Sequence, residues 1–589
     1  MKKILALALA LLMMISLFAG CKSPEPSANI GNDDIAFPSE VTNTDKSIEG
    51  GILKVALTTE SAFKGVLNPV FYFDNYDAQL LKWFSESVFN ADENFVMDQE
   101  GVATYTYDVE AKTVTFTMRE GVKWHDGEKV TLDDYLFAFE IIGHKDYSGS
   151  RYDYVSGIVG MAEYTAGTAD TISGVTLSED EMEMTIEFLE FEPAILVGGI
   201  WSSAMPRHYW EGIEVKDMEA HEKSRMTPIG FGPFKVKTVV PGESIIYERF
   251  DDYWLGKPKL DGVEVKVISQ DLVAAAMEAG EFDVANFGLN VYPDYKDPTN
   301  YQYIGLLATV FNYTGFKLGT WDAEANGNAG SNILNPDAKM NNAKLRQAIG
   351  YAIDNVSICE DFYNGLRFVA TTAITPRHGG YQNTELAGFT YDPEKSKTLL
   401  DEAGYKDIDG DGFREDPNGE QFTIYWAFMD GVGSAEIAQF KMQCWEAIGL
   451  RVELYNGRLM EFNAFYDAVE LDEPGIDMYD GAWQTGFNPN PNGLWGHHSF
   501  ANYTRYSSDT MDAVIDDISS DKAWDQEFLT AKYNEWQEIF FNEAPAIPTQ
   551  WRMELSAVNN RVKSYTMESI DQRISLHLIE LTADAPFKK

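Results

Sequence analysis

The chain has 589 residues and a mass of 66.1 kDa, which is too long for one compact core, so at least two lobes are expected. Hydrophobic residues make up 44 % and charged residues 24 %, which excludes a globally disordered or fibrous chain. Asp and Glu number 93 against 46 Lys and Arg, a formal net charge of −47. A surface this acidic repels phosphate backbones and anionic headgroups, so no nucleic-acid partner and no electrostatic membrane binding are expected.

The N-terminus has the pattern of an export signal over residues 1–21. A short basic region precedes residues 4–19, an apolar run without a charged residue. This run is shorter than the roughly 20 residues that span a bilayer, so it predicts a secretory signal rather than a membrane helix. The small residues before Cys21 resemble the lipobox of bacterial lipoproteins, although Phe18 stands where Leu is usual. The resemblance implies that Cys21 is lipidated; the alternative is a cleaved signal with an incidental cysteine.

A tether and then a folded part follow the signal. Residues 22–50 are rich in Pro, Ser, Asn and Asp and poor in large aliphatic residues, which predicts a flexible linker. The folded part is expected to begin at Gly51, because residues 52–57 have the pattern of a buried strand. Cys359 and Cys444 lie in apolar, helix-like segments, which excludes a disulfide framework and favours buried free thiols.

Local signals further along the chain predict both helices and strands. Leu80, Phe84 and Val88 recur every fourth residue, which predicts a helix. Residues 113–118 alternate between apolar and polar, as a strand does, and the cap-and-proline pair at 392–393 predicts the start of another helix. Strands and helices alternate irregularly, so the fold class expected is mixed α/β.

Several sequence blocks follow one another along nearly the whole mature chain. They are residues 116–127, 230–234 with 252–258, 345–354, 391–395 and 543–548. In this order, behind the lipobox, they resemble the extracytoplasmic solute-binding proteins of ABC importers, in the family (family 5) that handles oligopeptides, dipeptides and nickel. The opening residues 53–57 and the long N-terminal lobe look most like the oligopeptide-binding lipoproteins of Gram-positive bacteria. Arg346 and Asp354 lie on one predicted helix, where they could pair within the lobe, and they are expected to have a structural role.

The resemblance implies a fold and a mode of action. It implies two α/β lobes joined by two hinge strands, with an extra subdomain in the first lobe. Lobe one would comprise residues 51–303 and 544–589, and lobe two residues 304–543. A ligand would bind in the cleft, and the lobes would close on it by hinge motion. Nothing would be cleaved, and the sequence has no nucleophile elbow and no phosphate loop, so no enzyme is expected.

The family's cleft loop aligns with residues 481–495 of lobe two. Aromatic rings, amides and chain breaks suit a loop that offers apolar surface and paired donors and acceptors. The candidate ligand residues in this loop are Trp483, Gln484, Thr485, Gly486, Phe487, Asn488 and Trp495. Further candidates are Thr59, Glu60 and Ser61 after the first strand, and Asn312 after the crossing strand.

One position departs from the family pattern. Short-peptide members place an Asp in this loop to bind the ligand's α-ammonium group, and here the matching position is Gly486. Either another acid takes this role, with Glu60 as the candidate, or the terminus is not anchored. The second case would favour long peptides or a non-peptide ligand.

An acidic stretch resembles part of a calcium loop. Asp407, Asp409 and Asp411 alternate and are followed by Gly412, which matches positions 1, 3, 5 and 6 of such a loop. The twelfth position is Asn418 instead of the bidentate Glu. A structural calcium ion and a metal-free surface turn both remain open, and no other cofactor is expected.

The resemblance thus predicts a monomeric, lipid-anchored receptor on the extracytoplasmic face of the bacterial cell membrane. It would capture oligopeptides and deliver them to the permease subunits of an ABC importer. The alternatives are the same fold binding oligosaccharides, or a secreted hydrolase or adhesin. The aromatic content of 13 %, with Trp483 and Trp495 in the loop, would suit the stacking of sugars, and the missing Asp fits this alternative too.

Overall fold

A computed structural model describes residues 37–59, 62–73, 75–92, 95–288, 292–325, 330–431, 433–567 and 575–589. The predicted signal peptide with Cys21, and the candidate ligand residues Glu60 and Ser61, lie outside the described residues. Within the described ranges, no helix combines the length and the apolar character that crossing a bilayer requires.

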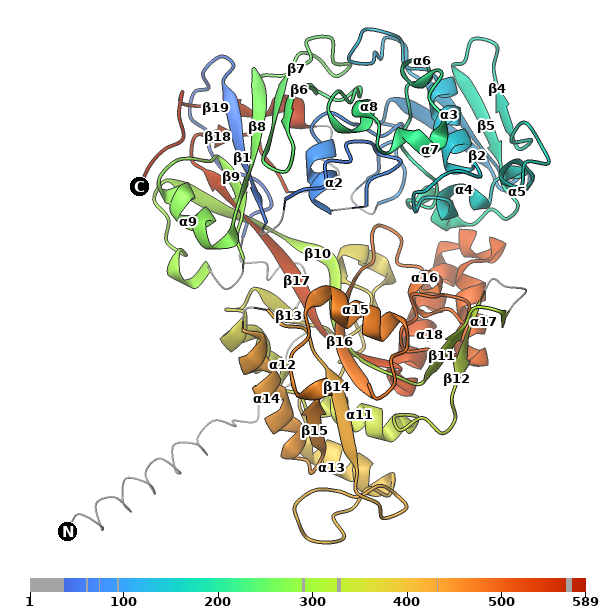
Figure 1. The fold of residues 1–589 in the computed structure, drawn as a ribbon, viewed down its shortest axis with the longest axis vertical. Helices are drawn as coiled ribbons and strands as arrows, with labels where there is room; N and C mark the ends of the chain where they lie inside the picture. The colour runs from blue at the N-terminus through green and yellow to red at the C-terminus, as the bar shows by residue number, and fades with distance from the viewer. Residues whose placement is uncertain are drawn as a thin grey trace.

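Two lobes share one large mixed sheet (Figure 1). Its central strands, β10 (Tyr301–Phe316) and β17 (Ala546–Asn559), pair antiparallel and run from the upper lobe into the lower one. In lobe one the sheet continues from β17 through β9 (Val284–Asn286), β1 (Ile52–Thr58), β8 (Gly262–Ile268), β7 (Ser244–Arg249) and β6 (Phe234–Val240). In lobe two it continues from β10 through β16 (Met478–Gln484), β14 (Thr423–Ala427) and β15 (Arg451–Leu454), and β13 (Arg367–Val369) also pairs with β17. The predicted two-lobed α/β fold with hinge strands is therefore confirmed.

The pairing of β10 with β17 is interrupted between the lobes. The register runs without a break from Tyr301 opposite Asn559 to Leu307 opposite Met553, and it resumes at Phe311 opposite Trp551. An irregularity of this kind leaves residues unpaired and lets the strand bend. The predicted lobe boundaries, at 303/304 and 543/544, fall within β10 and at the end of α18 (Gln526–Glu543).

The extra subdomain of lobe one has its own antiparallel sheet and core. The strand order is β2 (Ala103–Asp108), β3 (Thr113–Met118), β5 (Glu183–Glu187) and β4 (Val175–Leu177), so the strand predicted over residues 113–118 is confirmed. Helix α3 (Leu132–Ile142) packs against this sheet, and Trp124 on the adjoining turn donates a hydrogen bond from Nε1 to Asp134 at 2.9 Å. The shorter helices of lobe one are α4 (Asp153–Ser156), α5 (Met161–Thr165), η2 (Pro193–Leu196), α6 (Arg207–Trp210), α7 (Val215–Met218), α8 (Glu222–Arg225), α9 (Gln270–Glu278) and η3 (Tyr292–Asp294).

In lobe two, helices pack around two clusters of buried residues. Helices α11 (Ala343–Tyr351), α13 (Pro393–Glu402) and α14 (Ser434–Glu446) pack around one that contains Trp426 and Trp445. Helices α15 (Phe462–Glu470), α17 (Asp509–Ile518) and α18 pack around one that contains Phe311 and Trp551. Shorter elements are β11 (Gly319–Asp322), β12 (Ser331–Leu334), α12 (Asn355–Ser357), η4 (Ile358–Phe362), η5 (Pro376–Tyr381), η6 (Tyr455–Gly457), α16 (Asn492–Trp495) and η7 (Asp521–Trp524). The C-terminal return adds β18 (Val562–Lys563), η8 (Leu576–Leu578) and β19 (Glu580–Leu581) to lobe one.

Arg346 has a structural role, as expected, but it does not act through Asp354. Its guanidinium is buried and donates to the carbonyl oxygens of Met340 at 2.8 Å and Ala544 at 2.9 Å. Asp354 instead caps α12 by accepting a hydrogen bond from the amide of Ser357 at 3.0 Å. Arg346 therefore fastens the start of the returning hinge strand to lobe two.

Other local expectations need revision. Helix α2 spans Asn75–Leu81, so the helix predicted through Phe84 and Val88 is too long; these side chains are buried by packing outside a helix. The helix after Asp392 is confirmed as α13, with that residue as its N-cap. In the described part of the chain, neither Cys359 nor Cys444 forms a disulfide; Cys359 is buried and Cys444 is half-buried.

The described part of the predicted linker packs against lobe one. The Phe37 ring lies edge-on to Tyr292 and Tyr303, with centroids 5.7 and 6.0 Å apart. The amide of Val41 donates to the carbonyl of Tyr565 at 2.9 Å. Phe37 and Val41 thus already contact lobe one ahead of the start predicted at Gly51.

A buried ion pair ties the end of β17 to lobe one. Arg561 donates from Nε and Nη2 to the two carboxylate oxygens of Asp283, each at 2.6 Å, and the side chains are 1 % and 0 % exposed. Asp283 also accepts the amide of Lys54 on β1 at 2.8 Å.

Replacing Arg561 by Leu is expected to lower the free energy of unfolding by roughly 3–5 kcal/mol, because it leaves the Asp283 carboxylate buried without its cation. Urea unfolding measures this change. The matched control is Lys344→Leu, which removes a half-exposed pair with Glu402 and is expected to cost about 1 kcal/mol or less. Equal losses for the two variants would contradict this account of the buried pair.

Candidate functional site

Two cavities lie where the lobes face each other. The first, here called the loop cavity, has a volume of about 590 Å³. Lobe one lines it with residues 153–154, Glu192 and 197–199, and lobe two lines it with 484–495 and with Trp536 of α18, among others. Because both lobes supply its walls, a molecule bound there contacts both.

The second, here called the hinge cavity, has a volume of about 650 Å³. It is lined by α2 and by Lys82 directly after it, by the irregular part of β10, by Arg367 of β13 and by residues 552–556 of β17, among others. Gln484 lines both cavities, so they adjoin at this residue. Each volume falls within the range of about 300–1,000 Å³ that is typical of ligand pockets.

The structure places most of the predicted cleft loop in the loop cavity. The members that line it are Gln484, Thr485, Gly486, Phe487, Asn488 and Trp495. Thr485 donates from its amide and its hydroxyl to the carbonyl of Thr309 on β10, at 2.9 and 3.1 Å. The loop is thus fastened to a hinge strand, and its ligand-binding role remains a prediction.

His378 holds the same loop from another side. Its Nε2 donates to the carbonyl of Gly486 at 3.1 Å, and its Nδ1 lies 3.1 Å from the hydroxyl of Thr375. Burial lowers the pKa of His378 to about 4, so the ring is neutral near pH 7. Gly486 itself has a φ of +62°, a conformation that glycine adopts without strain.

Other candidate residues lie outside the cavity walls. Thr59 is 3 % exposed and is absent from the walls of both cavities as described. Trp483 points into lobe two, where its ring packs on Tyr503 at a centroid distance of 5.2 Å. Asn312 accepts a hydrogen bond from Nε of Arg552 at 2.8 Å, so it orients a residue of the hinge cavity.

Sequence reasoning missed a group of charged residues in the hinge cavity. Lys82, Arg367, Arg552 and Glu554 come from three separate segments, and only the spacing of the last two, on one face of β17, gives a local signal. Burial lowers the pKa of Lys82 to about 8, opposed by Glu554, and lowers the pKa of Arg367 to about 10. Burial likewise raises the pKa of Glu554, opposed by Arg552. Cations therefore outnumber the carboxylate in a partly dehydrated space.

Aromatic rings join the lobes beside the loop cavity. Phe95 of lobe one stacks on Phe487 of lobe two at a centroid distance of 4.7 Å. Trp524 of lobe two stacks on both Tyr107 and Phe191, at 5.1 Å each, and donates from Nε1 to the carbonyl of Phe191 at 2.9 Å. In Figure 1 the subdomain that carries these lobe-one residues lies above α16 and α17. The rings hold the lobes together there.

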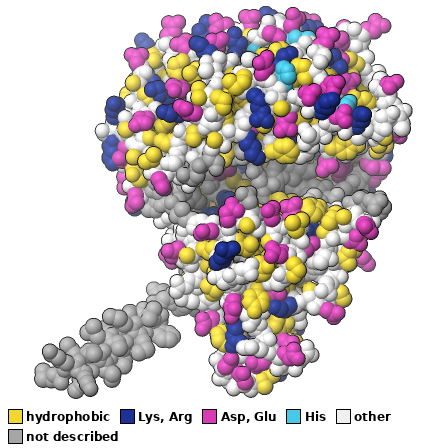
Figure 2. Space-filling view, viewed as in Figure 1, with side chains coloured by type: hydrophobic (Ala, Val, Ile, Leu, Met, Phe, Trp, Pro, Cys, Tyr) yellow, Lys and Arg dark blue, Asp and Glu magenta, His cyan; other side chains and the backbone are white. Residues whose placement is uncertain are grey.

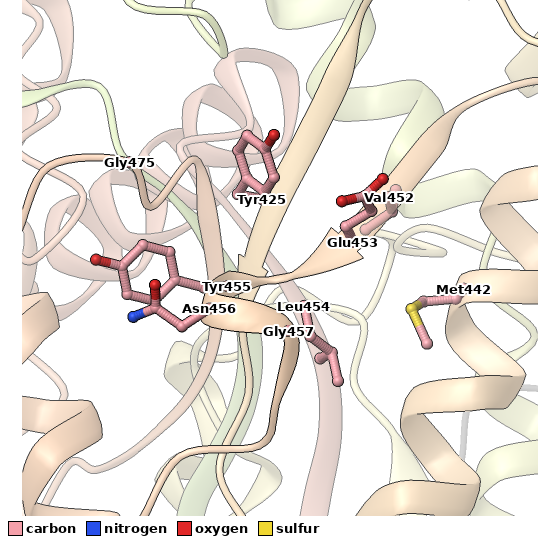
Figure 3. A pocket seen from close by; sticks show the side chains of 9 residues that line it. All are labelled: Tyr425, Met442, Val452, Glu453, Leu454, Tyr455, Asn456, Gly457 and Gly475. Carbon is pink, nitrogen blue, oxygen red and sulfur yellow. The ribbon is translucent and has the colours of Figure 1, made fainter.

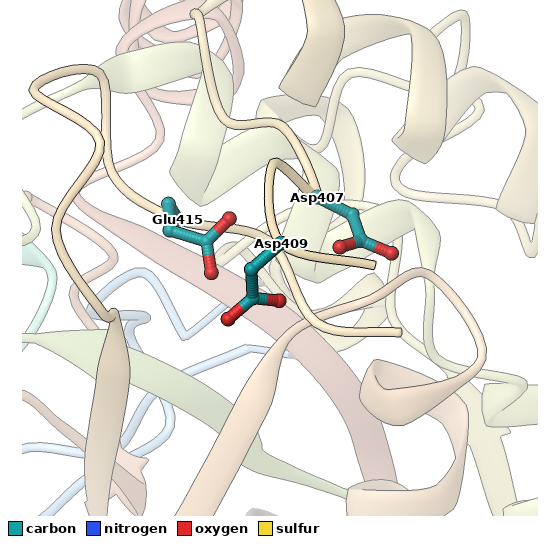
Figure 4. Close-up of side chains that lie close together, drawn as sticks. All are labelled: Asp407, Asp409 and Glu415. Carbon is teal, nitrogen blue, oxygen red and sulfur yellow. The ribbon is translucent and has the colours of Figure 1, made fainter. Parts of the chain in front are cut away.

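The acidic loop of lobe two differs from its predicted ligand set (Figure 4). Side-chain oxygens of Asp407, Asp409 and Glu415 lie within 4.8 Å of one another. Asp411 instead accepts a hydrogen bond from Nη2 of Arg451 at 2.8 Å, so it does not join this cluster. Glu415, which is 8 % exposed, accepts the amide of Ile408 at 2.7 Å. Calcium binding here remains a prediction, with Glu415 in place of Asp411.

A further cavity of about 600 Å³ lies at the outer edge of lobe two, beside β15 (Figure 3). Tyr425, Leu454 and Tyr455 line it, together with other residues of the same lobe. It lies outside the cleft. On the face shown in Figure 2, acidic side chains are scattered over both lobes and are not gathered into one patch.

The two-lobed architecture and its cleft agree with the comparisons. Residues 99–505 match the family described as bacterial extracellular solute-binding proteins, family 5 Middle. This chain belongs to that family. It is similar to the oligopeptide-binding protein OppA of Lactococcus lactis subsp. cremoris (strain SK11), with 30 % identity over 585 residues and 96 % of each chain covered.

Solved structures of family 5 proteins have the same fold. Lactococcal OppA complexed with an endogenous peptide in the closed conformation matches with a TM-score of 0.78 and 30 % identity, over 90 % of this chain and 100 % of that one. AppA from Bacillus subtilis in complex with a nonapeptide matches with a TM-score of 0.69 and 22 % identity, over 91 % and 100 %. The first match supports the resemblance to Gram-positive oligopeptide-binding proteins, and the second supports the fold.

Replacing Trp524 by Ala is expected to weaken ligand binding by roughly 5- to 150-fold. Each stacked aromatic pair contributes about 0.5–1.5 kcal/mol beyond its buried area, so the closed state loses about 1–3 kcal/mol relative to the open state. Isothermal titration calorimetry measures the affinity. The matched control is Trp321→Ala, whose ring packs on Phe500 within lobe two; an equal loss in the control would contradict a role in closure.

Calcium binding at the acidic loop is tested on chelator-treated protein. We expect calcium at 100 times its Kd to stabilise the folded protein by about 2.7 kcal/mol, seen as a rise in Tm. Asp409→Asn should abolish this rise. Asp411→Asn should preserve it, because Asp411 is engaged by Arg451. An unchanged Tm in the wild-type protein would favour the metal-free turn.

Proposed function

We propose that this protein captures oligopeptides in its interlobe cleft and delivers them to the permease of an ABC importer. The observation that carries the proposal is the hinge cavity, where Lys82, Arg367 and Arg552 face a single carboxylate among the described lining residues, Glu554. Every unmodified peptide supplies a compensating anion in its C-terminal carboxylate, whereas a neutral oligosaccharide does not. The printed names of similar proteins, such as oligopeptide-binding OppA and AppA, point to the same ligand class.

Binding and closure are coupled through the two hinge strands. A ligand that touches both walls of the loop cavity favours the closed state, and only this difference in affinity shifts the equilibrium. Apolar burial alone is insufficient: about 400 Å² contributes roughly 10 kcal/mol, against an association cost of about 4–15 kcal/mol. Hydrogen bonds to the peptide backbone and the preformed shape of the cleft supply the remainder, and they allow many peptide sequences to bind.

The proposal includes the location of the protein. The lipobox-like sequence at Cys21 supports a lipid anchor, which would hold a monomeric receptor on the extracytoplasmic face of the cell membrane. Residues 22–36 and the packed segment that follows would tether the lobes to this anchor. The family's role in solute binding supports a receptor without catalytic activity.

An oligosaccharide ligand is the second candidate, because sugars stack on aromatic rings. Phe487 and Trp495 line the loop cavity and offer such rings. Trp483, the other tryptophan for which this role was expected, packs on Tyr503 instead. The aromatic surface is therefore smaller than the sequence suggested. An oligosaccharide ligand would also leave the charges of the hinge cavity unexplained.

Mass spectrometry of the ligand carried through purification, followed by a thermal-shift screen, tests the proposal. We expect co-purified peptides, and a rise in Tm with peptides because ligand binding stabilises the folded state. Cello- and xylo-oligosaccharides and nickel should leave Tm unchanged. A rise with oligosaccharides alone would contradict the proposal, and released peptide fragments would contradict the absence of catalysis.

A further inference from the structure

We propose that Glu192 is a specificity residue of the cleft and that its carboxylate pairs with a positively charged group of the bound peptide. This inference rests on the proposed function and deepens it, because it names the chemistry that the loop cavity selects. The group is an ammonium or guanidinium, supplied either by the peptide's N-terminus or by a Lys or Arg side chain.

Glu192 is placed to meet a ligand. It directly precedes helix η2 in the extra subdomain and lines the loop cavity, to which lobe two also contributes lining residues. Its Oε2 atom is buried and has no hydrogen-bond partner among the described residues. A buried carboxylate oxygen without a partner is costly, so a ligand that brings a donor recovers the loss.

The charges of the loop cavity favour a cation over a neutral donor. Its described lining residues include two carboxylates, Asp153 and Glu192, and no Lys, Arg or His. The hinge cavity has the opposite balance, with three cations and one carboxylate among its described lining residues. A zwitterionic peptide fits this polarity when its cationic part lies in the loop cavity and its carboxylate in the hinge cavity.

A second unpartnered group lines the same cavity from the opposite lobe. Trp536 of α18 is 1 % exposed, and its indole Nε1 has no hydrogen-bond partner among the described residues. Lobe one thus presents an unpaired acceptor and lobe two an unpaired donor. A peptide offers a partner for each: a cationic group for Glu192 and a backbone carbonyl for Trp536. By pairing with both, it would link the two lobes.

Protonation of Glu192 is consistent with this role. Burial raises the pKa of its carboxyl to about 7. The titratable groups on the elements packed near Glu192 are Tyr533 of α18 and Asp521 and Lys522 of η7. Burial raises the pKa of Tyr533, so its hydroxyl stays neutral. Lys522 is exposed, and its Nζ lies 3.8 Å from Asp517. Asp153 lines the cavity from α4.

The sign of the pH dependence follows from these groups. The unliganded carboxyl is largely protonated below pH 7, whereas a bound cation favours its ionised form. Binding of a cationic peptide therefore releases a proton, and affinity rises with pH up to about 7. Above that it levels off for a Lys or Arg side chain, whereas for a free N-terminus it falls again as the α-ammonium group loses its proton at about pH 8.

Isothermal titration calorimetry with Glu192→Gln tests the inference on the full chain. The probes share one uncharged peptide core and differ in one group: a free N-terminus, an acetylated N-terminus, or an acetylated N-terminus with one Lys in the core. We expect the wild-type protein to bind at least one cationic probe 10- to 100-fold more tightly than the acetylated, lysine-free probe. Glu192→Gln should remove most of this preference while binding the uncharged probe at least as well as the wild type does.

A matched control lies two residues away. Glu190 is 85 % exposed and paired with Lys112, so Glu190→Gln should keep the preference for the cationic probe. Whichever cationic probe gains affinity identifies the source of the positive group.

The outcomes separate this inference from the proposed function. If the wild-type protein binds all three probes equally, or if Glu192→Gln keeps the preference, the inference is overturned while peptide binding stands. If no probe binds to the wild-type protein, the proposed function fails and the inference fails with it. Titrations of the wild type at pH 6.5 in buffers of different ionisation enthalpy should show proton release with the favoured probe, and no release would also overturn the inference.

Discussion

The antiparallel pairing of β10 with β17 is the interaction on which the rest of the structure depends. It is continuous within lobe one, is interrupted after Leu307, and resumes at Phe311. The strands therefore join the lobes covalently and by hydrogen bonds, yet they have an irregular segment where bending is least costly. The same segment lines the hinge cavity through Ala308 and Val310, and Thr309 holds the cleft loop through Thr485. Movement of the hinge and the shape of the site are thus linked by neighbouring residues.

The cleft contains charges that the protein leaves partly uncompensated. The hinge cavity has an excess of cations, and the loop cavity has carboxylates without a cation among its described lining residues. A binding protein for many peptides cannot depend on side-chain shape, but most peptides share a cationic and an anionic end. Under the proposed function, opposite charges in adjoining cavities would recognise this shared feature, while roomy walls would tolerate the side chains between.

Much of the fold was accessible from the sequence because it depends on local patterns and ordered family blocks. The strand at 113–118, the helix after Asp392 and the two-lobed α/β class were all predicted. Helix α2 was predicted too long because burial of Phe84 and Val88 gives the same apolar spacing whether or not the backbone is helical. The packing of Phe37 on lobe one was missed because the composition around it resembles a linker.

The site was less accessible, since its residues meet only through tertiary structure. The loop 484–488 could be located from its composition and family alignment. The side chain of its neighbour Trp483, in β16, instead packs on Tyr503 within lobe two. Glu192 and Trp536 are far apart in the chain and have no shared motif. Glu415 stands in the acidic cluster in place of Asp411, because Asp411 forms an ion pair with Arg451 of β15. The spacing of the acidic residues in the sequence does not reveal this ion pair.

Small-angle X-ray scattering of ligand-stripped protein, before and after addition of a peptide shown to bind, tests the central claim most directly. Closure of two lobes around a ligand predicts a smaller radius of gyration in the peptide-bound state. An unchanged radius at saturating peptide would contradict a cleft that closes on its ligand.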